Sequence, residues 1–381
     1  MPLLDMTDAE LERHGARWTV REIMQQPAVW AEALQALGDN VGLRRFIDAQ
    51  LATPHLRIVL TGAGTSAFIG ECLAPALGAA TGLRVEAIAT TDIVSGPGLC
   101  LAEDVPTLLV SFARSGNSPE SVAAVQLADH FVKDCRQLVI TCNANGELAR
   151  EMAQRDEAKC RAVVLPDATH DRSFAMTSSF TTMLLVAAQC FGVAERADVL
   201  VAAARRLMPQ VPEQCAPWVG HFDRVVYLGS NELKGLAREA ALKLLELSDG
   251  RIVSLFDSPL GFRHGPKTIV NDATLVVIFL SSDPYTRKYD LDLLRELRAD
   301  GRAGKVLAIG TLGDDLKAGV DTLDLAGAQG LTDVELAPLY ILFAQWFALQ
   351  QSLALGLTPD NPSVSGTVNR VVQGVTIHPV H

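Results

Sequence analysis

The spacing of apolar residues changes character near Arg57. The first fifty residues carry apolar positions at helical spacing, with an interruption at Pro27. From Arg57 onward, short β-branched and apolar stretches, of which 57–62 (RIVLTG) is the first, alternate with longer helical ones. This alternation predicts an α/β fold with helices flanking a parallel sheet. Thr19 and Glu22 have the spacing of a capping box, so we expect a helix to begin there.

Three apolar stretches recur 167 residues later in the chain. The pairs are RIVLTG from Arg57 with RVVYLG from Arg224, LRVEAI from Leu83 with GRIVSL from Gly250, and TLLVSF from Thr107 with TLVVIF from Thr274. One ungapped register for three matches indicates a duplicated βαβαβ unit. We therefore predict two similar α/β domains joined near the prolines around residue 213. The predicted segments are a helical lead-in at 1–50, domains at 51–200 and 210–345, and a helix end and tail at 346–381.

Composition and charge restrict the class of protein. The chain has 381 residues of which 49% are hydrophobic, so it can bury sizeable cores. A net charge of −11 argues against nucleic acid or an anionic membrane as a partner. The seven cysteines are scattered without a C-x-x-C pair, which fits neither a disulfide framework nor a zinc site. With an acidic N-terminal stretch in place of a signal peptide, we expect a soluble cytoplasmic protein.

A charged stripe crosses the helical stretch that follows Gly229. Glu232, Glu239, Lys243 and Glu246 recur at spacings of seven, four and three, which places them on one helix face. Because the opposite face is apolar, the helix is expected to present two or more carboxylates and an ammonium to a cleft. The alternative is an ordinary solvated face with an i,i+4 Glu to Lys pair.

A titratable imidazole follows this helix. His264 stands in Arg263-His264-Gly265-Pro266, where Gly265 and Pro266 exclude a regular helix. The stretch therefore predicts a loop that carries a histidine.

Two loops have the chemistry of an anion site. The stretch 61–67 (TGAGTSA), with Gly64, Thr65 and Ser66, follows the first strand and precedes a helix, where backbone N–H groups and the helix dipole favour an anion. The same stretch fits G-x-G-x-x-A, with Glu86 at the distance of a ribose-binding acid, so a nicotinamide enzyme is an alternative. Against it, the duplicate of Glu86 is expected to be Val253.

The second loop, 111–121, lies after the strand that begins at Thr107. Arg114, Ser115 and Ser118 combine a guanidinium with hydroxyls beside a turn glycine, which suits a phosphoryl group. The alternative is a serine-rich helix cap beside a solvated arginine. A third polar cluster, around His170, is interpreted as structural.

These motifs together resemble those of a known family, the sugar isomerase (SIS) domain proteins. GAGTS, ARSGNS, the Glu239/Lys243/Glu246 helix and RHGP are similar, in order, to motifs of the isomerase half of glucosamine-6-phosphate synthase. With REIMQQPAVW, DRSFAMTSSFTT and SGTVNRVVQGVTIHP, residues 19–381 resemble the galactosamine-6-phosphate deaminase/isomerase type. The resemblance implies two tandem SIS domains with flavodoxin-like parallel sheets, and a homodimer or larger homo-oligomer with composite active sites.

The resemblance also implies roles for individual residues. It places Ser66, Ser115 and Ser118 at the sugar phosphate, Glu246 at the proton transfer between C1 and C2, and His264 at ring opening. Lys243 and Glu239 match other polar site residues of the helix. Two positions depart from the synthase pattern, because Ala113 replaces a phosphate-binding serine and Gln373 replaces the tail lysine. Arg114 stands where the synthase has glutamine, so its role as a phosphate clamp rests on chemistry alone.

The chemistry of these groups supports an aldose–ketose interconversion. Such a reaction needs an acid/base to open the ring, a carboxylate to carry the proton, and a cation near the developing enolate oxygen, and it needs neither a metal nor another cofactor. We therefore predict an enzyme that converts galactosamine 6-phosphate into tagatose 6-phosphate and ammonia.

Three alternatives to this reaction stay open. They are a plain ketose/aldose-phosphate isomerase, a glucosamine-6-phosphate deaminase and a sugar-phosphate-sensing regulator. Residue chemistry does not fix the configuration at C4. The regulator is disfavoured because the sequence shows neither a helix-turn-helix segment nor a basic face.

Overall fold

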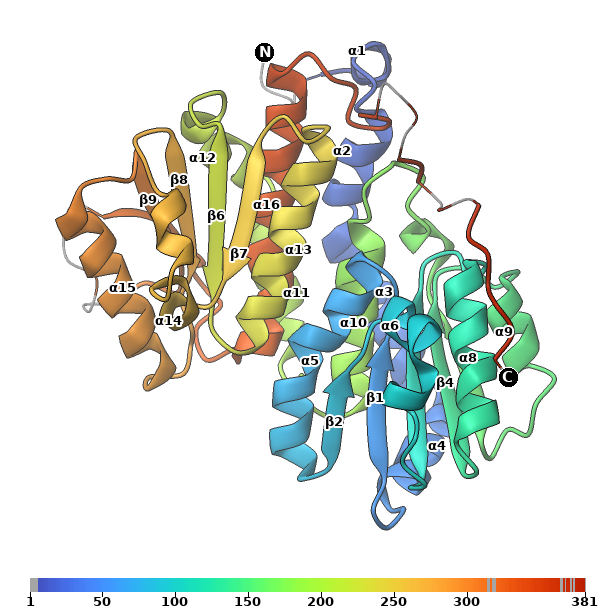
Figure 1. The fold of residues 1–381 in the computed structure, drawn as a ribbon. Helices are drawn as coiled ribbons and strands as arrows, with labels where there is room; N and C mark the ends of the chain where they lie inside the picture. The colour runs from blue at the N-terminus through green and yellow to red at the C-terminus, as the bar shows by residue number, and fades with distance from the viewer. Residues whose placement is uncertain are drawn as a thin grey trace. The chain divides into compact units, whose positions relative to one another are not determined.

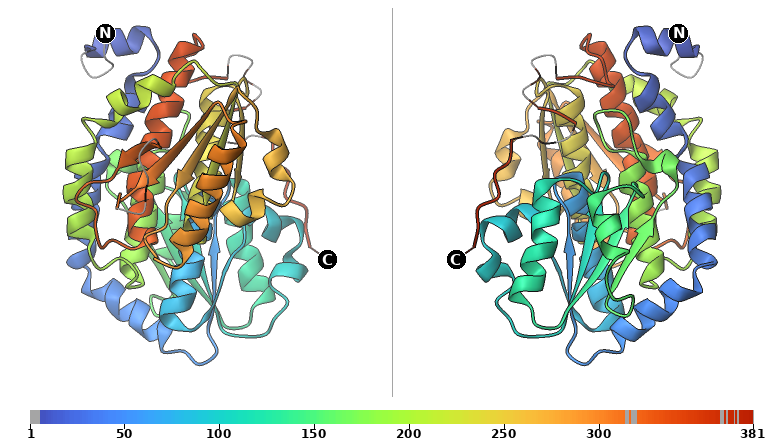
Figure 2. Two further views of the ribbon diagram at one scale, coloured as in Figure 1. Left: turned by 90° about the vertical axis from the view of Figure 1, so that its left-hand side faces the viewer. Right: turned by 90° about the vertical axis from the view of Figure 1, so that its right-hand side faces the viewer.

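The residues described fall into two compact units. The structure is a computed structural model that describes residues 6–313, 316, 320–363, 366, 368–370, 372 and 374–380. Unit 1 contains the described residues of Met1–Pro27, Arg172–Thr177 and Arg196–Thr367. Unit 2 contains those of Ala28–Asp171, Ser178–Glu195 and Val368–His381. In each unit, helices cover both faces of a sheet (Figure 1), and Figure 2 shows the same layers from two further sides.

Unit 2 is built on a five-stranded parallel sheet. Its order, β2-β1-β3-β4-β5, is that of a flavodoxin-like fold. β1 and β3 lie at the centre and are buried along their whole length, as expected of a sheet covered on both faces. The strands are β1 (Arg57–Thr61), β2 (Arg84–Ala87), β3 (Thr107–Ala113), β4 (Cys135–Thr141) and β5 (Cys160–Val164).

Helices cover the sheet of unit 2 on both faces. The alternate positions Val59 and Leu109 pack with α6, α8 and α9, while the other face of β1 meets α5, where Gly70 lies against Leu60. α10 packs against α5 and β4. The helices of this unit, including α3, which begins in unit 1, are α3 (Gln26–Gly38), α4 (Val41–Leu51), α5 (Thr65–Thr81), α6 (Thr90–Ser95), α7 (Pro97–Cys100), α8 (Pro119–Phe131), α9 (Glu147–Met152), η2 (Asp167–Thr169) and α10 (Ser178–Cys190).

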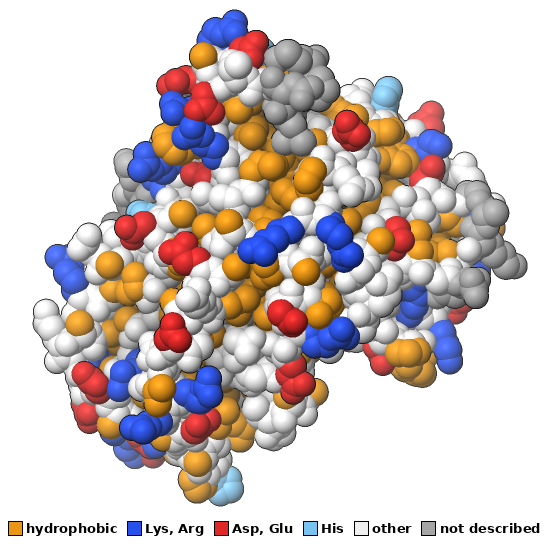
Figure 3. Space-filling view, turned by 180° about the vertical axis from the view of Figure 1, so that it is seen from behind, with side chains coloured by type: hydrophobic (Ala, Val, Ile, Leu, Met, Phe, Trp, Pro, Cys, Tyr) orange, Lys and Arg blue, Asp and Glu red, His pale blue; other side chains and the backbone are white. Residues whose placement is uncertain are grey.

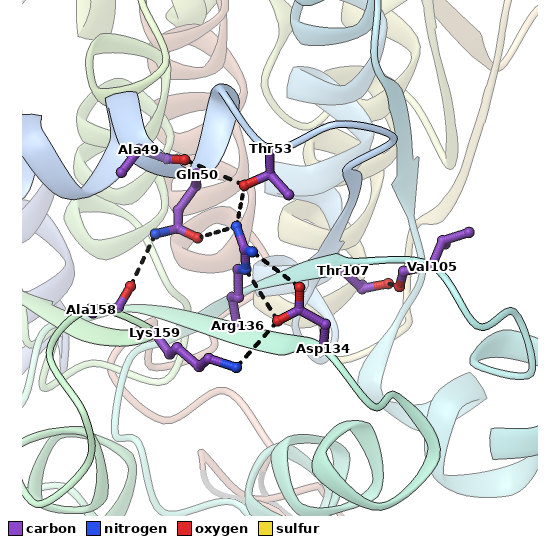
Figure 4. A network of polar contacts seen from close by, with 9 residues as sticks. All are labelled: Ala49, Gln50, Thr53, Val105, Thr107, Asp134, Arg136, Ala158 and Lys159. Carbon is purple, nitrogen blue, oxygen red and sulfur yellow. Dashed lines mark hydrogen bonds and ion pairs between the residues drawn. The ribbon is translucent and has the colours of Figure 1, made fainter.

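A polar network fastens α4 to the amino-terminal edge of this sheet (Figure 4). The Arg136 guanidinium donates to Gln50 Oε1 at 3.0 Å, also contacts the Thr53 hydroxyl, and pairs with Asp134 at 3.0 Å. Gln50 in turn donates to the Ala158 carbonyl at 3.2 Å. The network thus joins α4 to the starts of β4 and β5.

Unit 1 repeats the same architecture. Its sheet has the order β10-β9-β8-β6-β7, again all parallel, which is the order of unit 2 read from the other edge. The strands are β6 (Arg224–Gly229), β7 (Val253–Asp257), β8 (Thr274–Phe279), β9 (Lys305–Gly310) and β10 (Asp321–Asp324).

Helices cover this second sheet on both faces as well. On one face, Val226 packs with α14 and α15. On the other face, Tyr227 stacks on Phe279, which contacts Tyr340 of α16, and α13 packs along α16, β6 and β7. The helices are α1 (Asp8–Arg13), α2 (Arg17–Met24), α11 (Ala197–Leu207), α12 (Val211–Cys215), η3 (Ala216–Trp218), α13 (Glu232–Leu247), α14 (Pro259–Phe262), η4 (Pro266–Ile269), α15 (Thr286–Asp300) and α16 (Asp333–Ala354).

The duplication is confirmed, with one correction to its register. Arg57 lies opposite Thr107 and Arg224 lies opposite Thr274, so the central strands keep the 167-residue offset. The edge strands do not, because Arg224 pairs with Val253, whereas Arg57 pairs with Arg84, an offset of 169. The expected match of Glu86 with Val253 is therefore wrong. Glu86 pairs with Val59, and the corresponding Val226 pairs with Leu255.

The predicted capping box at Thr19 and Glu22 is wrong. Both residues lie inside α2, which begins at Arg17. A distant carboxylate does the capping, because Asp360 accepts from the backbone N–H groups of Trp18 and Thr19 at 3.1 and 2.8 Å. Glu22 instead accepts from the backbone N–H groups of Arg172 and Ser173.

The surface mixes charged and apolar side chains. On the face shown in Figure 3, the coloured lysine and arginine side chains are interspersed with acidic, apolar and uncharged ones. Within the described residues, none of the helices is both long enough and apolar enough to cross a bilayer.

Candidate functional site

The two predicted anion loops leave the same edge of the sheet in unit 2. Thr61, the last residue of β1, lies opposite Ser111 of β3. Because neighbouring parallel strands end at one edge, the loop before α5 and the loop before α8 lie next to each other.

The first loop is a tight strand-to-helix turn. A Cβ on Gly62 would lie 2.5 Å from the backbone carbonyl carbon of Ser66, so only glycine fits there. Gly64 is the N-cap of α5 with φ of 55°, so no side chain caps the first N–H groups of this helix. Thr65 and Ser66 form the first turn and are buried. The positive end of the α5 dipole therefore faces this turn, as an anion site requires.

The second loop is held by its own serines and by the segment that precedes α9. Ser118 is the N-cap of α8, where its hydroxyl accepts from the Ser121 N–H at 3.3 Å and donates to the Ser121 hydroxyl at 2.7 Å. Ser115 Oγ accepts from the Asn117 N–H at 3.3 Å, and the Ser115 carbonyl accepts from the Asn143 amide at 2.8 Å. The helix-cap interpretation is thus right for Ser118, and it fixes the shape of the loop.

Arg114 is buried and not solvated. Its side chain is 8% exposed, and Nη2 donates to the carbonyl of Arg370 at 2.8 Å. Arg370 comes from the C-terminal segment and donates through its own guanidinium to the carbonyl of Asp171. Sequence reasoning missed Arg370, because it lies 256 residues from its partner in an unpatterned tail. Gln373, the predicted replacement of the tail lysine, lies outside the described residues.

Three hydroxyls are buried beneath these loops. Thr61, Thr90 and Ser111 are at most 2% exposed, and within the described part of the chain their hydroxyls have no hydrogen-bond partner. Thr61 and Ser111 lie side by side in the sheet, and the Thr90 N–H donates to the carbonyl of Gly62 at 2.8 Å. Buried hydroxyls are normally satisfied, so this edge of the sheet has unused hydrogen-bonding capacity. The polar ends of the apolar stretches RIVLT and TLLVS were the sequence signal for it.

The glutamate that suggested a ribose site is already paired. Glu86 binds Arg57 at 2.6 Å and Arg84 at 3.0 Å. Burial raises the pKa of Glu86, but the hydrogen bonds from the two arginines outweigh it and the net shift is downward. The ion pairs with two arginines explain Glu86 without a ribose, which weakens the nicotinamide alternative.

In unit 1, the charged stripe of α13 is not a solvated face, because Glu239 and Lys243 are buried and Glu232 and Glu246 are only part-exposed. Lys243 Nζ lies 2.5 Å from a carboxylate oxygen of Glu246 and 3.4 Å from one of Glu239. Lys243 and Glu239 are fully buried, while the side chain of Glu246 is 23% exposed. Burial lowers the pKa of Lys243, but Glu239 and then Glu246 outweigh it, and the pKa is raised overall. Lys243 is therefore an ammonium at neutral pH, and it contacts two carboxylates.

The predicted histidine loop follows α14 and is anchored on both sides of the histidine. Arg263 pairs with Glu296 of α15 at 2.6 Å, and Lys267 pairs with Glu296 and Asp300. The His264 side chain is exposed, and the His264 backbone N–H donates to the Gly261 carbonyl at 2.9 Å. Its basic neighbours thus fix the loop backbone and leave the imidazole accessible.

Carboxylates occupy the part of unit 1 that corresponds to the anion loops of unit 2. Asp290 accepts from the Ser230 hydroxyl at 2.6 Å and from the Ser281 N–H at 2.8 Å. Asp333 accepts from the Ser281 hydroxyl and from the Ser282 N–H at 2.6 Å. Burial raises the pKa of Asp290 to about 6. The donors that could bind a phosphate in unit 1 are thus already used by its own aspartates.

The site residues consequently form two groups. Gly64, Thr65, Ser66, Arg114, Ser115 and Ser118 lie in unit 2 at one sheet edge, and Glu239, Lys243, Glu246 and His264 lie in unit 1. The first group offers hydroxyls, a helix N-terminus and a guanidinium to an anion. The second offers a buried carboxylate–ammonium–carboxylate row and an exposed imidazole, which are groups suited to proton transfer.

Comparison with known proteins assigns the family. A family model described as the SIS domain matches residues 50–191. The D-galactosamine-6-phosphate deaminase AgaS of Escherichia coli is 48% identical to this chain, over 95% of this chain and 96% of the relative. The chain belongs to the AgaS family of SIS-domain proteins. Another AgaS relative, the D-galactosamine-6-phosphate deaminase of Shewanella sp. strain ANA-3, is 47% identical over 97% of this chain and 94% of its own.

A solved structure confirms the fold over the whole chain. The crystal structure of tagatose-6-phosphate ketose/aldose isomerase from Escherichia coli matches with a TM-score of 0.90 and 42% identity, covering 100% of both chains. The match therefore covers both five-stranded sheets of this chain.

Proposed function

We propose that this AgaS-family chain converts galactosamine 6-phosphate and water into tagatose 6-phosphate and ammonia. The observation that carries the proposal is the buried Glu239–Lys243–Glu246 row, in a chain 48% identical to a protein named for this deamination. The anion loops of unit 2 supply the binding chemistry for the phosphate, and α13 supplies the acid/base chemistry.

The residues of α13 fit the proton transfer in particular. Glu246 is the part-exposed carboxylate of the row, so it can reach a substrate while Lys243 holds it in place. In the open-chain sugar, Glu246 removes the proton from C2 and returns it to C1. The electron pair of the broken C2–H bond forms the C1=C2 double bond of the enolamine, and protonation at C1 leaves an imine at C2. Over the two steps the C1 carbonyl oxygen gains the proton that the amino group loses. Water then adds to C2 and ammonia leaves.

Lys243 acts as a cation in this scheme and not as a nucleophile. An ammonium between two carboxylates with a raised pKa stays protonated at neutral pH, so it does not form an imine with the substrate. It balances the negative charge that returns to Glu246 when this carboxylate gives the proton to C1. His264, exposed on its anchored loop, is assigned to opening the sugar ring.

A plain ketose/aldose isomerase is the second candidate, because the matching solved structure carries that name. The two reactions share the proton transfer and differ in the C2 substituent and in the hydrolysis that releases ammonia. The deciding experiment supplies galactosamine 6-phosphate, glucosamine 6-phosphate and tagatose 6-phosphate separately and measures ammonia and ketose phosphate together. Equal amounts of ammonia and tagatose 6-phosphate from the first substrate support the proposal. Isomerisation of tagatose 6-phosphate without ammonia from either hexosamine phosphate would replace it by the isomerase.

We further propose a cytoplasmic homodimer, or a larger homo-oligomer, with composite active sites. The exposed imidazole of His264, on a loop held by ion pairs, supports this proposal, because it is accessible to a neighbouring subunit. All seven cysteines are free, and burial raises the pKa of Cys142 to about 12, which suits a reducing compartment.

A further inference from the structure

The C-terminal segment makes a reciprocal contact with the anion loops of unit 2. Arg114 Nη2 donates to the carbonyl of Arg370 at 2.8 Å, and the Arg370 guanidinium donates to the carbonyl of Asp171. The backbone carbonyl of Arg370 therefore accepts from Arg114, while its guanidinium donates to Asp171. This contact places the backbone of Arg370 against Arg114 and the Arg370 guanidinium against the backbone of Asp171.

The pKa of His170 depends on the positive charges of Arg114 and Arg370. His170 is half-buried, and burial, then Arg370, then Arg114 lower its pKa. Asp171 and Asp167 act in the opposite direction without reversing the shift. The carboxylate of Asp171 is used elsewhere, because it accepts from the hydroxyls and the backbone of the first turn of α10. The electrostatic field at His170 is thus dominated by the two arginines.

We propose that Arg370 is a phosphate-binding residue that forms a two-arginine anion site with Arg114. Arg114 contacts the backbone of Arg370, and both arginines act electrostatically on His170, so a dianion bound at this place would be attracted by both guanidiniums. The unused buried hydroxyls of Thr61 and Ser111 lie at the same sheet edge and add donors. The inference rests on the proposed function for the identity of the ligand, a sugar phosphate. It adds that the C-terminal segment of this chain binds the phosphate.

The first test measures the dissociation constant of inorganic phosphate by titration calorimetry. The proteins compared are wild type, Arg370→Met, Arg370→Lys and the control Arg161→Met. Arg161 belongs to β5 of the same unit and pairs with Glu157. Loss of one charge-assisted contact is expected to weaken binding about tenfold to hundredfold in Arg370→Met. Arg370→Lys keeps the charge and should retain part of the affinity, and Arg161→Met should match wild type.

The second test separates binding from anchoring of the tail. The pKa of His170 is followed by NMR, with its signal assigned from a His170→Gln spectrum. Phosphate should raise this pKa, because it neutralises the arginines, and Arg370→Met should raise it in the absence of phosphate. If Arg370 only anchored the segment, the lysine and methionine variants would lose affinity equally and phosphate would leave the pKa of His170 unchanged.

Three outcomes overturn the inference: no phosphate binding by wild type, an affinity of folded Arg370→Met within about twofold of wild type, or the anchoring result above. Its failure is separable from that of the proposed function. If wild type releases no ammonia from galactosamine 6-phosphate but Arg370→Met still weakens phosphate binding, only the proposed function fails. If wild type releases ammonia and Arg370→Met binds phosphate normally, only the inference about Arg370 fails.

Discussion

Replacing Lys243 by methionine should destabilise the protein strongly, because it leaves Glu239 buried without its cation. At 3.4 Å the attraction between the Lys243 ammonium and Glu239 is about 5 kcal/mol at an effective dielectric constant of about 20. Desolvation offsets part of this, but removing one partner of a buried pair typically costs about 3–5 kcal/mol. We therefore expect Lys243→Met to lower the free energy of unfolding by about 3–5 kcal/mol at pH 7.

The assay is denaturant unfolding of matched variants of one helix. Lys234→Met is the control, since Lys234 is also on α13 but is half-exposed and lies 3.6 Å from Asp257, so its loss should cost about 1 kcal/mol or less. The double variant Lys243→Met/Glu239→Leu removes both buried charges and should recover most of the loss. A Lys243→Met loss no larger than that of the control, or a double variant no more stable than the single one, would contradict a stabilising role of the buried pair.

The same pair gives a pH dependence with a definite sign. The pKa of Lys243 is raised above 10.5, its ordinary value, so its stabilising contribution is complete below about pH 10.5 and is lost as the pH rises further. Wild type should therefore lose stability in this alkaline window, and Lys243→Met should not show this loss.

Three further predictions concern the anion loop, the aspartates of unit 1 and the subunits. Gly62→Ala should weaken phosphate binding at least tenfold, because its Cβ would lie 2.5 Å from a backbone atom of α5, whereas Gly78→Ala, with its nearest contact at 3.8 Å, should match wild type in titration calorimetry. The pKa of Asp290 is raised to about 6, so its ionisation opposes folding and its contribution to the free energy of unfolding should increase as the pH falls from 7 towards 5. An unfolding series in which wild type and Asp290→Asn show the same pH dependence would contradict this. Mixing inactive Glu246→Gln with inactive His264→Ala protein should restore some ammonia release, and a monomer at micromolar concentration would rule out composite sites.

The sequence was sufficient for the central strands of both sheets. The 167-residue offset places β1 with β6 and β3 with β8 in the correct register. It fails at β7 because the turn after α13, from Ser248 to Ile252, is longer than the turn at Gly82 after α5. A shift of two residues keeps every side chain of a strand on the same face, so short apolar strands match equally well in either register. The apolar pattern therefore could not reveal the shift at β7.

Local sequence patterns could not predict contacts between residues that lie far apart in the chain. The capping box at Thr19 had the correct spacing, but Asp360, 341 residues away, supplies the cap. Arg370 reaches the anion loop in the same way, through a bond that spans 256 residues. The stripe of α13 was visible in the sequence, yet its burial depends on how α13 packs along α16, which periodicity alone does not determine.

The most direct test of the account is the turnover of galactosamine 6-phosphate by Glu246→Gln, followed as ammonia release. Glutamine keeps the shape of the side chain and its contact with Lys243 but cannot carry a proton. Loss of a positioned general base typically lowers the rate about 10²–10⁴-fold, so we predict a fall in kcat of that size with KM changed by no more than a few fold. A variant that releases ammonia at the wild-type rate would contradict the assignment of Glu246 as the proton carrier.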